Sequence, residues 1–300
     1  MVKLEGIATF VAVAESGSLS EVARRLRVSR SVVSERLVEL ERALGTSLLQ
    51  RSTRRLALTE DGLAFLERAV RIVREVQDAA ADLAERRGEL RGPLRISAPV
   101  TFGRMHLDPA LYPFLARHPG ILLTLDLDDR RVDAGADGFD AVIRHGPIAD
   151  RYLVAWRIGA SRRVLVAAPA YLARHGTPRS LEELDGHRGI YYLHRGVADW
   201  RFAQADGMRI VRGQPGLVLN NGDMMRDAAI AGLGIALLPR FIAGAALAAG
   251  TLHAIDVGVE AEQEHLYIAH ADGQHPSAKL RALAAWLKDA FGSPPYWDTL

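Results

Sequence analysis

Arginine and serine side chains gather near the N-terminus at a spacing that suits recognition of duplex DNA. Ser29 is expected to cap a helix over about residues 30–44, which carries Arg30, Ser31 and Ser34 opposite an apolar stripe. A recognition helix contacts base edges from its N-terminal end, where a guanidinium can bridge two guanine acceptors. The candidate DNA contacts are Ser29, Arg30, Ser31, Ser34, Arg36, Arg51, Thr53, Arg54 and Arg55.

A helix pair and a two-stranded wing would position these groups. Ser18 and Glu21 have the spacing of a capping box, which begins a short helix, and Gly45 supplies the left-handed residue that ends the second one. The basic run 51–55 then lies between two short apolar stretches. Apolar, basic, apolar is typical of a two-stranded wing with a charged tip.

The positive charge is local. Residues 21–55 hold nine arginines and four acids, an excess of five, whereas the whole chain has a net charge of +2. Helix pairs with a capping box occur in many folds, and surface arginines are often only solvated. The local charge favours phosphate binding over that alternative.

The run ATFVAVAESGSLSEVARRLRVSRSVVSERLVELERALGTSLLQRSTRRLALTEDG resembles the N-terminal domain of LysR-type transcriptional regulators. The segments LRISAPVTFG, GFDAVIRHG, VLVAAPAYLARHG, NNGD and AGLGIALLP are similar to the effector domain of that family. Two positions depart from the family pattern: Ser31 stands where proline is frequent, and Glu35 stands where a basic residue is frequent. The set of base contacts therefore stays open.

The resemblance implies an α/β protein with three parts: a winged helix-turn-helix over 1–60, a linker and dimerisation helix with a hinge over 61–91, and an effector domain over 92–300. That domain would be two-lobed and periplasmic-binding-protein-like (type 2), with lobe I at 93–162 plus 266–300 and lobe II at 163–265. The implied function is regulation of transcription, without enzymatic activity. The implied partners are promoter DNA, a small effector, RNA polymerase and further copies of the chain, as a homodimer and homotetramer that bends DNA.

A long helix should follow the wing, because residues 63–87 contain neither glycine nor proline. Apolar positions three and four apart form one narrow seam, as in a coiled coil. Such a helix would meet a copy of itself; the alternative is packing on its own chain. The seam is Leu63, Leu66, Val70, Val73, Gln77 and Ala80.

From about residue 94 short apolar runs alternate with helical segments, which predicts an open α/β sheet with parallel strands. Ligands bind such sheets at the carboxyl ends of strands. Candidate effector contacts at those ends are Pro99, Val100, Thr101, Phe102, Arg144, His145, Asn220 and Asn221. By the resemblance, Arg144 would hold an anionic group and Phe102 would make apolar contact.

Several of these residues also have a simpler structural interpretation. Thr101 and Asn220 can be helix caps, Arg144 can pair with Asp140, and Asp223 is expected to be a cap.

Composition narrows the function classes. The chain has no cysteine, which excludes disulfides, thiolate metal sites and thiol-based peroxide sensing. Its ten histidines show no close pairing, so no metal or cofactor is expected, and no GxSxG, HExxH or P-loop motif indicates an enzyme. No signal peptide is apparent and the most apolar stretch, 228–252, is interrupted by glycines, so a cytoplasmic protein without a membrane partner is expected. A nonspecific architectural DNA binder would not need the cleft-bearing second half.

Overall fold

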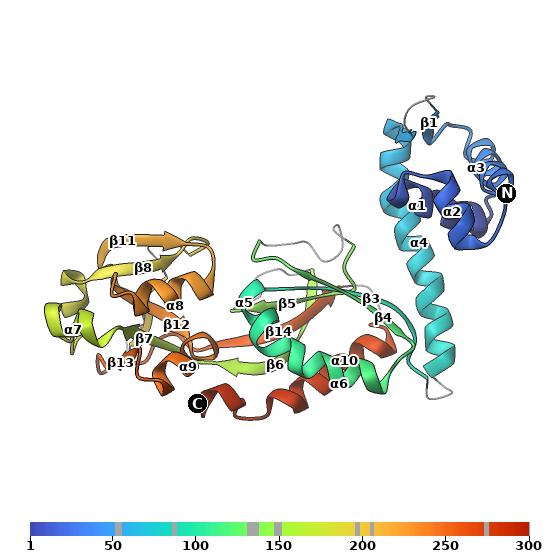
Figure 1. Cartoon of the computed structure of the whole chain (residues 1–300). Helices are drawn as coiled ribbons and strands as arrows, with labels where there is room; N and C mark the ends of the chain where they lie inside the picture. The colour runs from blue at the N-terminus through green and yellow to red at the C-terminus, as the bar shows by residue number, and fades with distance from the viewer. Residues whose placement is uncertain are drawn as a thin grey trace. The chain divides into compact units, whose positions relative to one another are not determined.

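The computed structural model describes residues 1–51, 56–85, 89–130, 138–146, 152–195, 199–204, 207–272 and 276–299. The chain forms two compact units, Met1–Gly92 and Pro93–Leu300 (Figure 1). Within the described part of the chain, no helix combines the length and apolarity that crossing a bilayer requires.

The first unit is a winged helix-turn-helix followed by a long helix. Its elements in order are α1 (Leu4–Ser16), α2 (Leu19–Leu26), α3 (Arg30–Leu44), β1 (Leu49–Arg51), β2 (Leu56–Leu58) and α4 (Glu60–Glu85). The two strands pair antiparallel, as a wing requires. Phe10, Val33, Leu37 and Leu48 are buried in the core that joins α1, α3 and the wing.

Local capping explains where the helices of this unit begin and end. Ser29 Oγ accepts from the backbone N–H of Val32 at 3.3 Å, and Gly45 ends α3 at φ +76°. Ser18 Oγ accepts from the N–H of Glu21 at 3.3 Å, but the backbone N–H of Ser18 donates to Ser16 Oγ. The expected capping box is therefore only half formed, because the N–H of Ser18 donates to Ser16 Oγ and not to the Glu21 side chain.

The seam predicted on α4 needs correction. Leu66, Val70 and Val73, which were expected to face a second copy of the chain, are partly buried against the core of their own unit. The reason is that α1 packs along the first half of α4, where Phe65 meets the Phe10 ring at 5.7 Å. Gln77, Ala80 and Leu63 are exposed.

The second unit contains two five-stranded sheets and a hairpin. The first sheet has the order β4-β3-β5-β14-β6 and the second β11-β8-β12-β7-β13. The strands are β3 (Gly92–Ala98), β4 (Ile121–Leu127), β5 (Ala141–His145), β6 (Leu153–Ser161), β7 (Arg163–Ala167), β8 (Arg188–Tyr192), β9 (Arg201–Gln204), β10 (Gly207–Ile210), β11 (Gln214–Leu219), β12 (Ile235–Pro239), β13 (His253–Ile255) and β14 (Glu264–Ala271). The hairpin is β9 with β10.

Each sheet is the centre of a lobe, and the chain crosses between the lobes twice. The first crossing lies at Arg162, between β6 and β7, and the second lies between β13 and β14. Because β14 returns from the other lobe, it runs antiparallel to β5 and β6, and β7 runs antiparallel to β12 and β13. The expectation of wholly parallel sheets was wrong for these strands.

Helices cover both sheets (Figure 1). The segment after β3, expected as one helix, is α5 (Val100–Phe102), a π turn over Gly103–Leu107 and α6 (Asp108–Arg117). The others are α7 (Pro169–His175), α8 (Gly222–Ile230), α9 (Arg240–Ala248) and α10 (Ala278–Phe291), with short 3-10 turns at Glu183–Gly186 and Tyr296–Asp298.

Candidate functional site

The N-terminal end of α3 presents polar side chains to solvent. Arg30 and Ser31 are exposed and Ser34 is half-buried, while Ser29 Oγ lies 2.7 Å from Ser31 Oγ. Arg30 makes no ion pair with any residue that the structure describes. Its guanidinium is thus available to an external acceptor.

Arg36, predicted as a DNA contact, lies elsewhere on the helix. Its Nη2 forms an ion pair with Glu5 Oε2 of α1 at 3.2 Å, and its side chain is only 29% exposed. Six residues after Arg30, a helical residue points some 240° around the axis, so Arg36 faces α1. Thr53, Arg54 and Arg55 lie outside the described residues, as does the side chain of Arg51.

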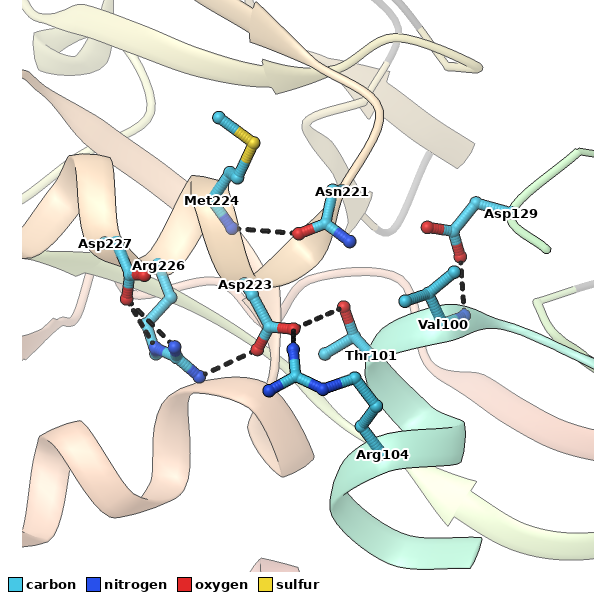
Figure 2. Close-up of polar contacts among 9 residues, drawn as sticks. All are labelled: Val100, Thr101, Arg104, Asp129, Asn221, Asp223, Met224, Arg226 and Asp227. Carbon is cyan, nitrogen blue, oxygen red and sulfur yellow. Dashed lines mark hydrogen bonds and ion pairs between the residues drawn. The ribbon is translucent and has the colours of Figure 1, made fainter. Parts of the chain in front are cut away.

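A cavity of about 390 Å³ lies between the two lobes. Five of the predicted effector contacts line it: Pro99, Thr101, Phe102, Arg144 and His145. Val100, Asn220 and Asn221 are not on its wall. Val100 N–H donates to Asp129 Oδ1 at 3.0 Å, and Asn221 caps α8 by accepting from the N–H of Met224 at 3.1 Å (Figure 2).

Asp223 joins the two lobes at one edge of this cavity. Its Oδ2 accepts from Thr101 Oγ1 at 3.3 Å and from Arg104 Nη1 at 3.1 Å, both on the first lobe. Its Oδ1 accepts from Arg226 Nη1 of its own helix at 3.0 Å. Figure 2 shows the carboxylate between the two guanidinium groups. The prediction that Asp223 is a cap was wrong, because Asn221 holds that position.

Arg144 brings an unpaired positive charge into the cavity. It donates to Ile143 O at 2.7 Å and to Ser97 Oγ at 3.1 Å, and it makes no ion pair with a described carboxylate. The alternative partner, Asp140, instead accepts from the backbone N–H of Arg95 at 2.6 Å. Burial lowers the pKa of Arg144, yet a guanidinium stays charged at any physiological pH. Asp128 and Asp129 also line the cavity and act on Arg144 from beyond ion-pair distance, so its half-buried guanidinium keeps donors for an anionic ligand.

His145 is uncharged at neutral pH, although a carboxylate lies beside it. Its Nε2 is 2.7 Å from Ser161 Oγ and 3.0 Å from Glu264 Oε2. Burial lowers the pKa of His145 to about 4 and outweighs the opposing effect of Glu264. The imidazole can therefore accept or donate a hydrogen bond without adding charge to the cavity.

Glu264 receives its compensating charge from the other lobe. It lies at the start of β14, and Arg195, which follows β8, contacts its Oε1. Burial acts to raise the pKa of Glu264, but the charges of Arg163 and Arg195 hold it below its usual range. A Cβ on Gly146 would approach Arg195 Nη2 to 2.7 Å, so glycine at this position leaves room for the guanidinium.

A buried ion pair supports the second lobe's wall. Arg163 Nη2 lies 2.5 Å from Asp199 Oδ1 and 2.9 Å from Leu237 O, and Asp199 Oδ2 accepts from the N–H of Tyr192 at 3.1 Å. Burial, followed by nearby charges, raises the pKa of Tyr192 to about 12, so its hydroxyl stays protonated. Sequence reasoning missed Arg163, Tyr192, Arg195, Asp199 and Glu264, because no motif or local spacing links them.

Comparison with known proteins decides the family. Residues 4–63 match the model of the bacterial regulatory helix-turn-helix protein, lysR family, and residues 87–292 match the LysR substrate binding domain. The chain belongs to the LysR family. This LysR-family chain is 34% identical over 290 residues to the HTH-type transcriptional regulator YhjC of Escherichia coli, covering 96% of this chain and 97% of that protein. It is 31% identical over 291 residues to the transcriptional regulator CrgA of Neisseria meningitidis, with 96% and 97% covered.

Solved structures of relatives share this organisation. The structure of Neisseria meningitidis CrgA superposes with a TM-score of 0.60 at 29% identity, covering 95% of this LysR-family chain and 98% of that one. The full-length virulence activator AphB of Vibrio cholerae gives 0.57 at 26% identity, with the same coverage. This chain is thus a LysR-type DNA-binding transcriptional regulator with an effector domain, and members of the family are regulators, not enzymes.

Proposed function

We propose that this regulator reads a near-palindromic operator through the N-terminal end of α3, binds DNA as a dimer or tetramer, and responds to a small anionic effector between its lobes. The observation that supports effector binding is Arg144, a half-buried guanidinium on the cavity wall that makes no ion pair with a described carboxylate. RNA polymerase is the proposed partner through which the bound regulator acts.

Support for DNA reading comes from exposure and charge. Arg30 and Ser31 are exposed at the start of a capped helix, where base edges can be reached. The local excess of arginine would add a salt-dependent affinity for phosphates.

Changing Arg30 to alanine is expected to relax base preference by about 1–3 kcal/mol at one position of the operator. Arg54→Ala is the matched comparison: it should weaken all sequences about equally and lower the salt slope by about one. The measurement is binding to variants of the gene's own upstream region across a salt series. Identical profiles for both variants would overturn these two roles.

Support for self-association comes from one face of α4. The apolar stripe that is buried at Ala69 continues along α4, where Ile72 and Val76 are 41% and 44% exposed. Figure 1 shows that α4 extends beyond α1. A second copy of α4 would bury this half of the stripe. The edge strands β4 and β11 also expose apolar side chains, Leu122 and Val218, which offers a second surface for assembly into a tetramer.

Support for an effector comes from the inter-lobe cavity. Its volume falls in the range of small-molecule sites, about 300–1,000 Å³. Arg144 and the neutral Tyr192 hydroxyl would both donate to a carboxylate. Phe102, predicted as an apolar contact, is fully buried behind the wall.

Changing Arg144 to glutamine is expected to weaken effector binding by about 10–100-fold, because a charge-assisted hydrogen bond contributes about 1.5–3 kcal/mol. A thermal-shift screen of aromatic and aliphatic acids on the full chain identifies a ligand, and titration calorimetry then compares the variant. Arg117→Gln, an exposed change at the end of α6, is the control. An unchanged affinity in Arg144→Gln would reject this residue as the anion site.

A further inference from the structure

A second cavity of about 560 Å³ lies on the other face of the interlobe crossings, and we name it the hinge cavity. It is lined by residues of β6, the start of β14, the end of α10 and the segment 292–298. Arg162 lines it, whereas the next residue, Arg163, lines the inter-lobe cavity. Successive residues of an extended chain point to opposite sides, so the two cavities lie on opposite faces of the crossing strands, although Glu264 lines both.

The hinge cavity has more positive than negative charge. Arg157, Arg162 and Lys288 line it, their side chains are exposed, and none forms an ion pair with a described carboxylate. The opposing acids are Asp298 and Glu264, of which Glu264 is already neutralised by Arg195. Three cations therefore face one uncompensated acid.

The acid on this wall is not paired with the cations. Asp298 Oδ1 is buried without a hydrogen-bond partner among the described residues. Burial raises the pKa of Asp298, although Arg162 and Arg240 act to lower it.

We propose that the hinge cavity is a second ligand site that binds a small organic phosphate. A phosphate offers several oxygens to cations that come from different elements, β6, the crossing itself and α10. Inorganic phosphate would leave most of the 560 Å³ empty, whereas Ile158, Pro294 and Pro295 on the wall can contact an organic body.

The site is placed to influence the arrangement of the lobes. Arg162 is the only residue between β6 of one lobe and β7 of the other, and its carbonyl accepts from the backbone N–H of Arg240 at 2.7 Å. A ligand held by Arg162 from the crossing and by Lys288 from α10 contacts both the hinge and the first lobe. If the two lobes can adopt two relative arrangements, such a ligand shifts the equilibrium between them by the difference in its affinity for each.

Titration calorimetry of the full-length protein with glycerol 3-phosphate tests this proposal. We expect measurable binding that Arg162→Gln and Lys288→Gln each weaken by at least about tenfold, the loss of one charge-assisted hydrogen bond. Arg117→Gln is the matched control and should bind as the unmodified protein does. Unchanged unfolding midpoints, followed by tryptophan fluorescence, would show that the variants fold.

Four results would overturn the proposal, three of them with glycerol 3-phosphate itself. They are no binding at millimolar glycerol 3-phosphate, an equal loss in Arg117→Gln, or a loss in Arg144→Gln, which would place the phosphate in the inter-lobe cavity. Inorganic phosphate is the second probe, and an affinity equal to that of the ester would exclude a site for an organic body. Retained binding of glycerol 3-phosphate in Arg144→Gln would distinguish this site from the proposed effector site, so each of the two proposals can be rejected independently of the other.

Discussion

Replacing Asp199 with alanine is expected to lower the unfolding free energy of the effector domain by about 3–5 kcal/mol. The buried Arg163 guanidinium, now 2.5 Å from Asp199, would lose its only ion-pair partner among the described residues. A buried cation without a partner keeps its desolvation penalty and loses its attraction. The N–H of Tyr192 would lose its acceptor as well.

Urea unfolding followed by tryptophan fluorescence measures this effect. All four tryptophans belong to the second unit, so the signal reports that unit within the full chain: Trp156, Trp200, Trp286 and Trp297. Asp289→Ala, an exposed change on α10, is the control. The double variant Arg163→Met with Asp199→Leu should recover most of the loss, because it removes both charges. A loss below about 1 kcal/mol in Asp199→Ala would contradict the assignment.

Changing Val76 to glutamate is expected to turn the regulator into a monomer and to weaken operator binding by about 100-fold or more. A charge in the middle of the exposed stripe of α4 would be buried against the second copy without a partner. Two linked DNA-binding units also gain from effective concentration, which a monomer loses.

Analytical ultracentrifugation and operator titration of the same samples test this expectation. Ala64→Glu introduces the same charge at an exposed position about 120° around the helix axis from Val76 and should leave both assembly and affinity unchanged. A dimeric Val76→Glu protein would show that α4 is not the dimer contact.

The prediction for the first unit succeeded where the signals are local. Ser29 and Gly45 cap and end α3 through hydrogen bonds that span only three or four residues, so the sequence contains both partners. The apolar period of α3 likewise identifies Val33, Leu37 and Leu40 as core residues.

Prediction from the sequence failed where one apolar pattern is compatible with two different packing partners. The stripe on α4 is equally apolar whether it meets α1 or a second copy, and only the fold shows that α1 covers its first half. Apolar runs also predict strands without their direction. The reversal of β14 follows from the chain's return to the first lobe, which no local pattern encodes.

The residues of the inter-lobe cavity likewise include some that the sequence could predict and some that it could not. Its first-lobe residues lie at or just after the carboxyl ends of strands, so Thr101 and Arg144 could be found from position alone. Their electrostatic surroundings could not, because Thr101 meets Asp223 122 residues away and Arg163 meets Asp199 36 residues away. The sequence by itself determined the helix-turn-helix, the alternation of helices and strands in the second unit and the family resemblance, since these depend on short-range bonding and period. Only the tertiary structure decided which charges are paired and which are left for a ligand, because such pairing depends on distances that chain folding alone creates.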